Sequence, residues 1–217
     1  MCCKEITFQE LGFEPNPAQK LFYWTIDNNF NREPLYFWKG RQVGATFGTL
    51  AYALHQMIVE NCDICWIGNN LAAVKYARAE FHKLYNKLPP DMRSKLVRDN
   101  RYEICLKSGA SIDFVTEHMC GKCRRYDFVF MDEAAYFRNL QESICAMMPA
   151  AKQLIITSTC TRKECDFYRL FMENILYTRK LPWYLGSSEL QEQIPKYRTN
   201  LSSAAFAAEL CCEILDE

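Results

Sequence analysis

Residues 126–137 read YDFVFMDEAAYF. Its four apolar residues, 128–131, run directly into Asp132 and Glu133. An unbroken apolar run of this kind is typical of a strand buried inside a domain. Such a strand would carry two adjacent carboxylates at its C-terminal end, where the first can hold a divalent cation and the second can polarise a water molecule. The stretch therefore predicts a buried strand that ends in a reactive acidic pair.

Apolar runs and segments of helical periodicity alternate along the rest of the chain. Strands are expected over residues 35–38, 63–67, 102–106, 111–115, 128–131 and 153–157, and helices over residues 46–60, 70–86, 140–147, 165–175 and 204–215. Residues 88–101 have the composition of a surface excursion. Residues 107–110 have that of a hairpin turn. Residues 182–197 have the composition of an irregular segment that could begin a lid. The alternation predicts an α/β fold, in which helices flank both faces of a mostly parallel sheet.

The length and charge of the chain limit its possible functions. Its 217 residues are enough for one α/β domain with a small appended lid. Lys+Arg and Asp+Glu both number 26, whereas a protein that grips nucleic acid over its whole surface is usually basic. Contact with DNA would therefore need a local patch or a partner. No apolar run reaches membrane-spanning length and the first residues have no secretory apolar segment, so we expect a cytosolic protein that does not enter a membrane.

The chain has 12 cysteines, and two pairs have CxxC spacing, Cys62/Cys65 and Cys120/Cys123. Four thiolates at such spacing can form a zinc site. However, Cys65 lies in an apolar strand run, and alternation would send Cys62 and Cys65 to opposite faces of the sheet. The residues favour ordinary cysteines, and they leave open whether either pair binds zinc. So many thiols without a secretion signal indicate a reducing compartment.

A candidate phosphate loop follows the predicted strand 35–38. Residues 39–46 read KGRQVGAT, which departs from the usual pattern G-x-x-x-x-G-K-[S/T]. Ala45 occupies the lysine position, and Lys39 occupies the position of the first glycine. Because a phosphate is cradled by backbone N–H groups and by a helix N-terminus, Gly40 and Gly44 can still form the loop. Lys39 could reach the phosphates from the front of the loop.

The loop and the acidic pair each follow an apolar strand, which is the arrangement found in P-loop NTPases. Thr46 offers a hydroxyl to Mg²⁺, Asp132 would bind the same ion, and Glu133 would activate water. Arg41 adds a second cation beside Lys39. The alternative is an ordinary strand-turn-helix unit with a lysine there by chance.

A third apolar run, residues 154–159, ends in Thr157, Ser158 and Thr159. In helicase-like motors a strand of this type lies beside the acidic strand and senses the γ-phosphate. The alternative is a buried strand followed by a polar turn. The order of loop, acidic strand and hydroxyl strand predicts a P-loop NTPase core of the ASCE, RecA/helicase-like type, with a small C-terminal lid.

These motifs resemble the ATPase domain of tailed-bacteriophage terminase large subunits, the motors that package DNA. KGRQVGAT is similar to the phosphate loop of that family, FVFMDEAAYF to its acidic motif, and the residues TST at 157–159 to its coupling motif. Asn16-Pro-Ala-Gln19 resembles its adenine motif, and FAAEL at 206–210 resembles the stretch before its nuclease domain. The resemblance implies ATP and Mg²⁺ as cofactors, Thr46 and Asp132 as metal ligands and Glu133 as the catalytic carboxylate. The nucleotide-binding residues that it implies are Gln19, Lys39, Gly40, Arg41, Gln42, Val43, Gly44, Ala45, Thr46, Thr157, Ser158 and Thr159.

Motors of this family also insert an arginine into the active site, in some cases from a neighbouring subunit. The candidates here are Arg124 and Arg125, just before the acidic strand, and Arg41 in the loop. For Arg124 and Arg125 the alternative is a solvated loop.

The resemblance also implies an organisation and a set of partners. Residues 1–165 would form the ATPase core and residues 166–217 a lid or linker. Because the chain ends at Glu217, where the family's nuclease domain would begin, no nuclease activity is expected of it. The implied partners are double-stranded DNA, a homo-oligomeric ring on the procapsid portal and a small terminase subunit, in the host cytoplasm. Two other functions stay open: a helicase-like ATPase, and a non-catalytic nucleotide-binding scaffold, because Ala45 replaces the usual lysine.

Overall fold

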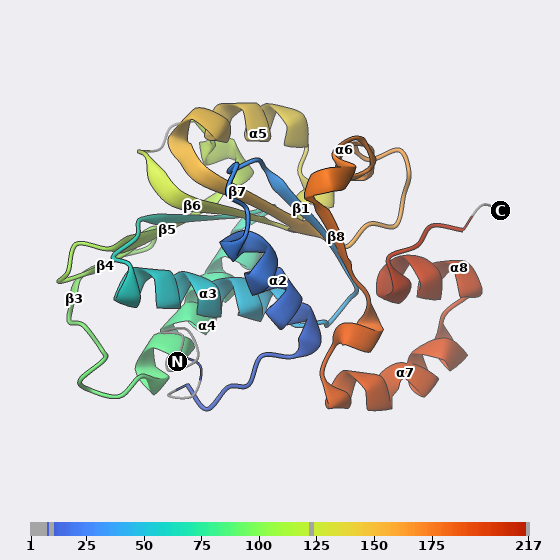
Figure 1. Cartoon of the computed structure of the whole chain (residues 1–217), viewed down its shortest axis with the longest axis horizontal. Helices are drawn as coiled ribbons and strands as arrows, with labels where there is room; N and C mark the ends of the chain where they lie inside the picture. Colours follow the sequence, from blue (N-terminus) through green and yellow to red (C-terminus); the bar gives the residue numbers. More distant parts are fainter. Residues whose placement is uncertain (1–7, 9–10, 122–123, 216–217) are drawn as a thin grey trace.

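A single eight-stranded sheet forms the centre of the computed structural model, which describes residues 8, 11–121 and 124–215 (Figure 1). The strands lie in the order β3-β4-β5-β2-β6-β7-β1-β8. Their bounds are β1 Leu35–Lys39, β2 Ile64–Gly68, β3 Leu96–Asp99, β4 Glu103–Leu106, β5 Ser111–Thr116, β6 Tyr126–Asp132, β7 Ala151–Ser158 and β8 Thr178–Leu181. The β3–β4 and β4–β5 pairs are antiparallel, and the other five pairs of neighbouring strands are parallel. The predicted mostly parallel sheet is confirmed.

Helices cover both faces of this sheet, as the α/β prediction required (Figure 1). The helices α3 and α4 lie on one face with α2 packed beside α3, and α5 and α6 lie on the other face. The helix bounds are α2 Pro17–Asp27, α3 Ala45–Val59, α4 Leu71–Lys87, α5 Leu140–Met147, α6 Asp166–Glu173, α7 Ser188–Asn200 and α8 Ser203–Phe206, followed by a π-helical turn, η6 Ala207–Cys211. Short 3₁₀ turns are η1 Glu117–Met119, η2 Ala134–Tyr136, η3 Met148–Ala150, η4 Ile175–Tyr177 and η5 Trp183–Leu185.

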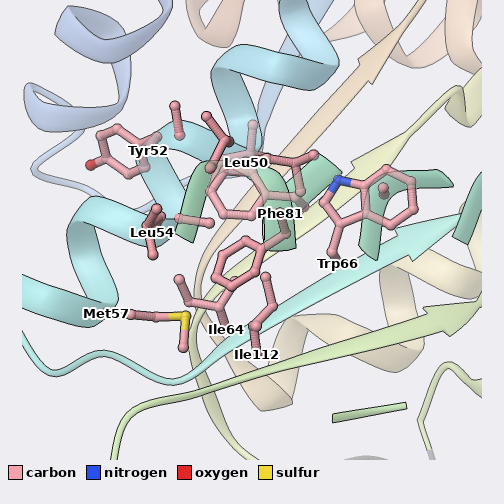
Figure 2. Close-up of a cluster of buried hydrophobic side chains, with 14 of the residues drawn as sticks. Leu50, Tyr52, Leu54, Met57, Ile64, Trp66, Phe81 and Ile112 are labelled. Atoms are coloured by element: carbon pink, nitrogen blue, oxygen red, sulfur yellow. The ribbon is translucent and has the colours of Figure 1, made fainter. Parts of the chain in front are cut away.

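Two apolar cores lie on the two faces of the sheet, because side chains alternate along each strand. In β2, Ile64 and Trp66 belong to one core while Cys65 and Ile67 belong to the other. Figure 2 shows the first core, in which side chains from α3, β2, α4 and β5 meet around Phe81. Each large apolar side chain buried in this way contributes about 1.5–3 kcal/mol to folding. The central strands are therefore fixed in register on both faces.

The cysteines of the first CxxC pair face opposite sides of the sheet, as the spacing predicted. Cys65 is fully buried in one core, whereas Cys62 is partly buried against the other. In the second pair, Cys120 is partly buried and Cys123 lies outside the described residues. Among the described residues, no group of three or more His, Cys, Asp or Glu side chains could hold a metal ion.

One predicted segment is wrong. Residues 182–197 are not irregular, because α7 begins at Ser188 with the Ser187 side chain as its N-cap. Pro195 lies inside this helix, where it removes one backbone hydrogen bond. The proline is tolerated because the helix buries Leu190 and Ile194. A proline that would break an isolated helix is thus outweighed by packing.

Other boundaries shift for local reasons. The helix expected over 204–215 ends at Cys211, because Cys212 adopts a left-handed backbone conformation with φ 58°. The expected surface excursion contains β3, and neither β8 nor α2 was expected. The sequence of β8, TRKL, carries two charges and gives no clear alternation. Because β8 pairs with β1, residues beyond 165 contribute to the main sheet, and a separate lid over 166–217 stays a prediction.

Candidate active site

The candidate phosphate loop joins the end of β1 to the start of α3 at the carboxyl edge of the sheet. Gly44 is the N-cap of α3 and has φ 84°, a left-handed conformation that favours glycine. A Cβ atom at this position would also lie 2.9 Å from the Nε2 atom of Gln19. The first N–H groups of α3, from Ala45 and Thr46 onward, have no acceptor within the helix, and the helix dipole makes this end positive. An anion at this end of α3 would meet unpaired N–H groups and a favourable dipole.

The N-terminus of α2 holds the loop in place. The Asn16 Nδ2 atom donates to the carbonyl oxygen of Val43 at 3.0 Å, and the Gln19 Nε2 atom donates to that of Gly44 at 2.9 Å. Asn16 and Gln19 also form a capping box, in which each side chain accepts from the other residue's backbone N–H. Gln19 is buried by these contacts. This anchoring role was not predicted, although the spacing of Asn16 and Gln19 is a capping-box signal.

Asp132 lies at the end of β6 and accepts two hydroxyl hydrogen bonds. Thr46 Oγ1 donates to its Oδ2 atom at 2.6 Å, and Thr157 Oγ1 donates to its Oδ1 atom at 2.8 Å. The second bond follows from the sheet, because Asp132 and Thr157 are register partners on adjacent parallel strands. Asp132 is 4% exposed, and these donors satisfy a carboxylate that would be costly to bury alone.

Glu133 follows directly and has a strained backbone. Its φ of 55° is uncommon for a residue with a side chain and points to a functional constraint. The Oε1 atom of Glu133 lies 2.6 Å from the Nζ atom of Lys39, and its Oε2 atom accepts from Thr159 Oγ1 at 3.3 Å. The side chain is 32% exposed. Glu133 is thus positioned by Lys39 at the end of β1 and by Thr159 directly after β7.

Lys39 ends β1 and its ammonium group lies beside both carboxylates. Its Nζ atom is 2.6 Å from Glu133 and 4.0 Å from Asp132, and its side chain is 7% exposed. Burial alone would lower the pKa of Lys39, but the carboxylates of Asp132 and Glu133 outweigh this effect and raise the pKa above its ordinary value. Lys39 therefore stays charged at neutral pH, and Ala45 leaves the usual lysine position without a cation.

The first half of the loop is held by residues far along the chain. The Arg41 guanidinium makes two bonds to the Glu209 carboxylate, at 2.7 and 3.0 Å, and Glu209 is the main cause of its raised pKa. The N–H of Arg41 donates to the carbonyl oxygen of Glu209 at 2.6 Å, and Tyr197 donates to the Gln42 side chain at 2.6 Å. A Cβ atom on Gly40 would lie 2.6 Å from the carbonyl oxygen of Leu210. No local sequence pattern predicts these contacts.

The hydroxyl residues at the end of β7 connect the site to the turn that follows Glu133. Ser158 accepts from the N–H of Ala135 at 3.0 Å and donates to the carbonyl oxygen of Thr159 at 2.7 Å. Together with the bonds from Thr157 to Asp132 and from Thr159 to Glu133, this ties the end of β7 to both acidic residues.

Arg124 and Arg125 do not reach this site within their own chain. They precede β6, whereas Asp132 ends it, and seven strand residues span roughly 23 Å. The Arg124 guanidinium instead lies 3.4 Å from Asp113 and 3.8 Å from Asp63, and it donates to Ser111. Arg125 is exposed. Both arginines therefore stay candidates for a role across a subunit boundary, because this geometry keeps them away from the acidic pair of their own chain.

Solved structures of phage large terminases share this fold. A variant ATPase domain of the Thermus phage P74-26 large terminase gives a TM-score of 0.71 at 15% identity, over 96% of this chain and 97% of that chain. The bacteriophage HK97 large terminase gives a TM-score of 0.67 at 14% identity, over 91% of this chain and 50% of that chain. A large terminase from a thermophilic bacteriophage, in complex with ADP, gives a TM-score of 0.65 at 10% identity, over 90% of this chain and 52% of that chain.

This chain spans about half the length of the last two proteins. None of the curated proteins matches it in sequence. The family model described as terminase large subunit, T4likevirus-type, N-terminal, matches residues 36–217, which include the loop, the acidic pair and the hydroxyl strand. The chain therefore belongs to the family of terminase large subunits, within the N-terminal part described by that model.

Proposed function

We propose that this chain hydrolyses ATP and serves as the motor domain that drives double-stranded DNA into a viral procapsid. The observation that carries the hydrolytic part is the convergence of Lys39, Thr46, Asp132 and Glu133 beside the N-terminus of α3. Membership of the terminase large subunit family supports the motor part. A large terminase of the same fold has also been crystallised with ADP.

In this proposal the loop and the start of α3 receive the phosphates through backbone N–H groups. Lys39 supplies the positive charge that Ala45 cannot. Gln19 contacts the adenine base as well as anchoring the loop. An amide side chain has two donor hydrogens and two acceptor lone pairs, and the two hydrogen bonds described for Gln19 leave one of each for the base.

The side chains fit a magnesium ion, because a hydroxyl and a carboxylate are the oxygen ligands that Mg²⁺ prefers. Thr46 and Asp132 would hold it, and a bound ion would neutralise charge on the phosphates. Thr157 fixes the orientation of the Asp132 carboxylate. Glu133 orients and deprotonates the attacking water, while Thr159 holds its second oxygen. Release of Lys39 from Glu133 toward the phosphate would free this base.

Translocation requires partners beyond the single chain. Zero net charge favours weak DNA binding by one copy, so a homo-oligomeric ring on the procapsid portal would concentrate basic loops around the duplex. Arg124 or Arg125 would complete a neighbouring subunit's site from the opposite edge of the sheet. A small terminase subunit would deliver the DNA, and the site of action would be the host cytoplasm.

The test is ATP turnover of the wild type against Lys39→Ala and Glu133→Ala, with circular dichroism to check that each variant folds. We expect both to lose activity, and loss of a general base alone typically costs about 10²–10⁴-fold. A matched control is Lys152→Ala, since Lys152 is a lysine at the opposite edge of the sheet. Undiminished turnover in Lys39→Ala would refute the relocated lysine.

Ala45 supports one competing function, a nucleotide-binding scaffold without turnover. The absence of hydrolysis by wild type at any protein concentration, combined with tight binding of ATP, would favour the scaffold. A helicase-like ATPase would instead separate the strands of a duplex, which a fluorescent strand-displacement assay measures. Hydrolysis that is stimulated by duplex DNA without strand separation supports the motor.

A further inference from the structure

Two thiols lie close together in the segment between β7 and α6. Cys160 is buried directly after the hydroxyl residues at the end of β7, and Cys165 is the half-buried N-cap residue of α6. Their Sγ atoms are 3.3 Å apart. Each also lies close to the carbonyl oxygen of Arg162, at 3.3 Å for Cys160 and 3.2 Å for Cys165. Five residues of separation and a short turn therefore bring two sulfur atoms into contact.

The surroundings of the pair favour a thiolate on Cys165. Its hydrogen bond with Cys160 is the largest cause of a lowered pKa, and the backbone amides of Phe167 and Tyr168 at the start of α6 act in the same direction against the effect of burial. Arg162 adds a positive charge nearby. In contrast, burial raises the pKa of Cys62 to about 11. A partly exposed thiolate at a helix start is the form of cysteine that attacks electrophiles.

We propose that Cys160 and Cys165 are a redox-active dithiol that low-molecular-weight disulfides oxidise to an intrachain disulfide. The Cys165 thiol first gives up its proton, and the resulting thiolate attacks one sulfur of the small disulfide. The S–S bond of the small disulfide breaks, and the thiolate that leaves takes up a proton and becomes the first small thiol. Cys160 then gives up its proton and attacks the Cys165 sulfur, and the second small thiol leaves with that proton. The protein loses two electrons and two protons in total, and one small disulfide becomes two thiols.

The position of the pair gives the oxidation a structural effect. Thr159, which donates to Glu133, immediately precedes Cys160, and Cys165 begins a helix whose Phe167 and Phe171 are buried in the second core. A disulfide would close the turn between β7 and α6 and restrict its movement. The proposal does not depend on ATP hydrolysis, because its product is a covalent bond that can be detected in a protein without turnover.

To test the proposal, the full chain is treated with oxidised glutathione, and the remaining thiols are blocked with iodoacetamide. The protein is then digested with trypsin in the absence of reductant. Trypsin cleaves after Arg162 and Lys163, so the disulfide would join the peptides 153–162 and 164–169. We expect this linked pair in mass spectra of the wild type, its disappearance after dithiothreitol, and its absence from Cys165→Ser. Linkage of either cysteine to another cysteine, or glutathione retained on Cys165 without closure, would overturn the proposal.

A second measurement tests reactivity without oxidant. In the reduced protein at neutral pH, iodoacetamide should modify Cys165 about tenfold or more faster than Cys62, which is also partly exposed. Cys160→Ala should slow the modification of Cys165, because it removes the hydrogen bond to that sulfur, while Cys160→Ser should restore much of the rate. Equal rates for Cys165 and Cys62 would refute the dithiol.

Discussion

The two edges of the parallel sheet carry similar kinds of charged residue in different environments. At the carboxyl edge, the Lys39 and Asp132 side chains are 7% and 5% exposed. At the amino edge, the Arg124 and Asp63 side chains are 41% and 37% exposed. Coulombic interactions strengthen as water is excluded, whereas exposed pairs are screened and contribute little. Burial, and not the number of charges, therefore distinguishes a candidate reaction centre from a solvated ion-pair network.

The largest expected difference concerns the two lysines that pair with aspartates at opposite edges. Lys39→Met should lower the free energy of unfolding by about 3–5 kcal/mol, because it leaves the buried carboxylate of Asp132 and the partly exposed carboxylate of Glu133 without their cation. Lys152→Met should lower it by about 0–1 kcal/mol, because Lys152 is 64% exposed beside Asp127. Urea unfolding of both variants at one pH measures the two losses. Equal losses would show that burial does not separate the two edges.

A smaller effect is expected from the threonine that supports Asp132. Thr157→Val removes a donor to a buried carboxylate and should cost about 1.5–3 kcal/mol. The matched control is Thr178→Val, which removes a bond from Thr178 Oγ1 to the carbonyl oxygen of Ile175 and should cost about 0.5–1.5 kcal/mol. Thermal unfolding of both variants measures the two stability losses. A larger loss in the control would mean that Thr157 contributes little to holding the carboxylate.

At the amino edge, acid should weaken the protein modestly through Asp127. Burial acts to raise the pKa of Asp127, but Lys152 and the backbone N–H of Asp63 outweigh it and lower that pKa. The stability from this group is present above the unfolded pKa of about 3.9 and is lost as the pH falls through the lower folded value. Between about pH 5 and about pH 3, Asp127→Asn should therefore lose slightly less stability than wild type. Identical acid profiles from urea unfolding would contradict this.

The smallest expected effect is that of Arg124→Ala on a dilute, monomeric chain. Because Arg124 lies at the amino edge, its removal should leave nucleotide affinity and basal turnover unchanged there. At concentrations where copies assemble, an arginine that acts across subunits would be worth roughly 10³–10⁵-fold in turnover. Turnover measured across a dilution series separates the two regimes. A large loss in the dilute chain would place Arg124 in its own site and break the distinction between the edges.

The sequence predicted the parts of the fold and site that depend on local patterns. The apolar run before Asp132, the glycines of the loop and the hydroxyls at the end of β7 each follow from strand and turn chemistry. The parallel sheet then aligns Asp132 with Thr157. The direction of β6 also separates Arg124 from Asp132, because one precedes the strand and the other ends it. That inference was available from the sequence alone.

The remainder depends on contacts between segments distant in sequence. The bonds between Arg41 and Glu209 join residues 168 positions apart, and no periodicity links them. The helix α7 contains Pro195, a residue that normally ends helices, and its packing is visible only in three dimensions. The roles of the site residues toward ATP stay predictions.

The close approach of Gly40 to Leu210, together with the backbone bond from Arg41 to Glu209, has a consequence for the order in which the protein folds during synthesis. The strand β1 and the loop leave the ribosome early, but Glu209 and Leu210 follow much later. Until then the first half of the loop lacks the backbone and side-chain partners that fix it. A nascent chain can form much of the central sheet before the loop is braced, so competence to hold a nucleotide would arise late in translation.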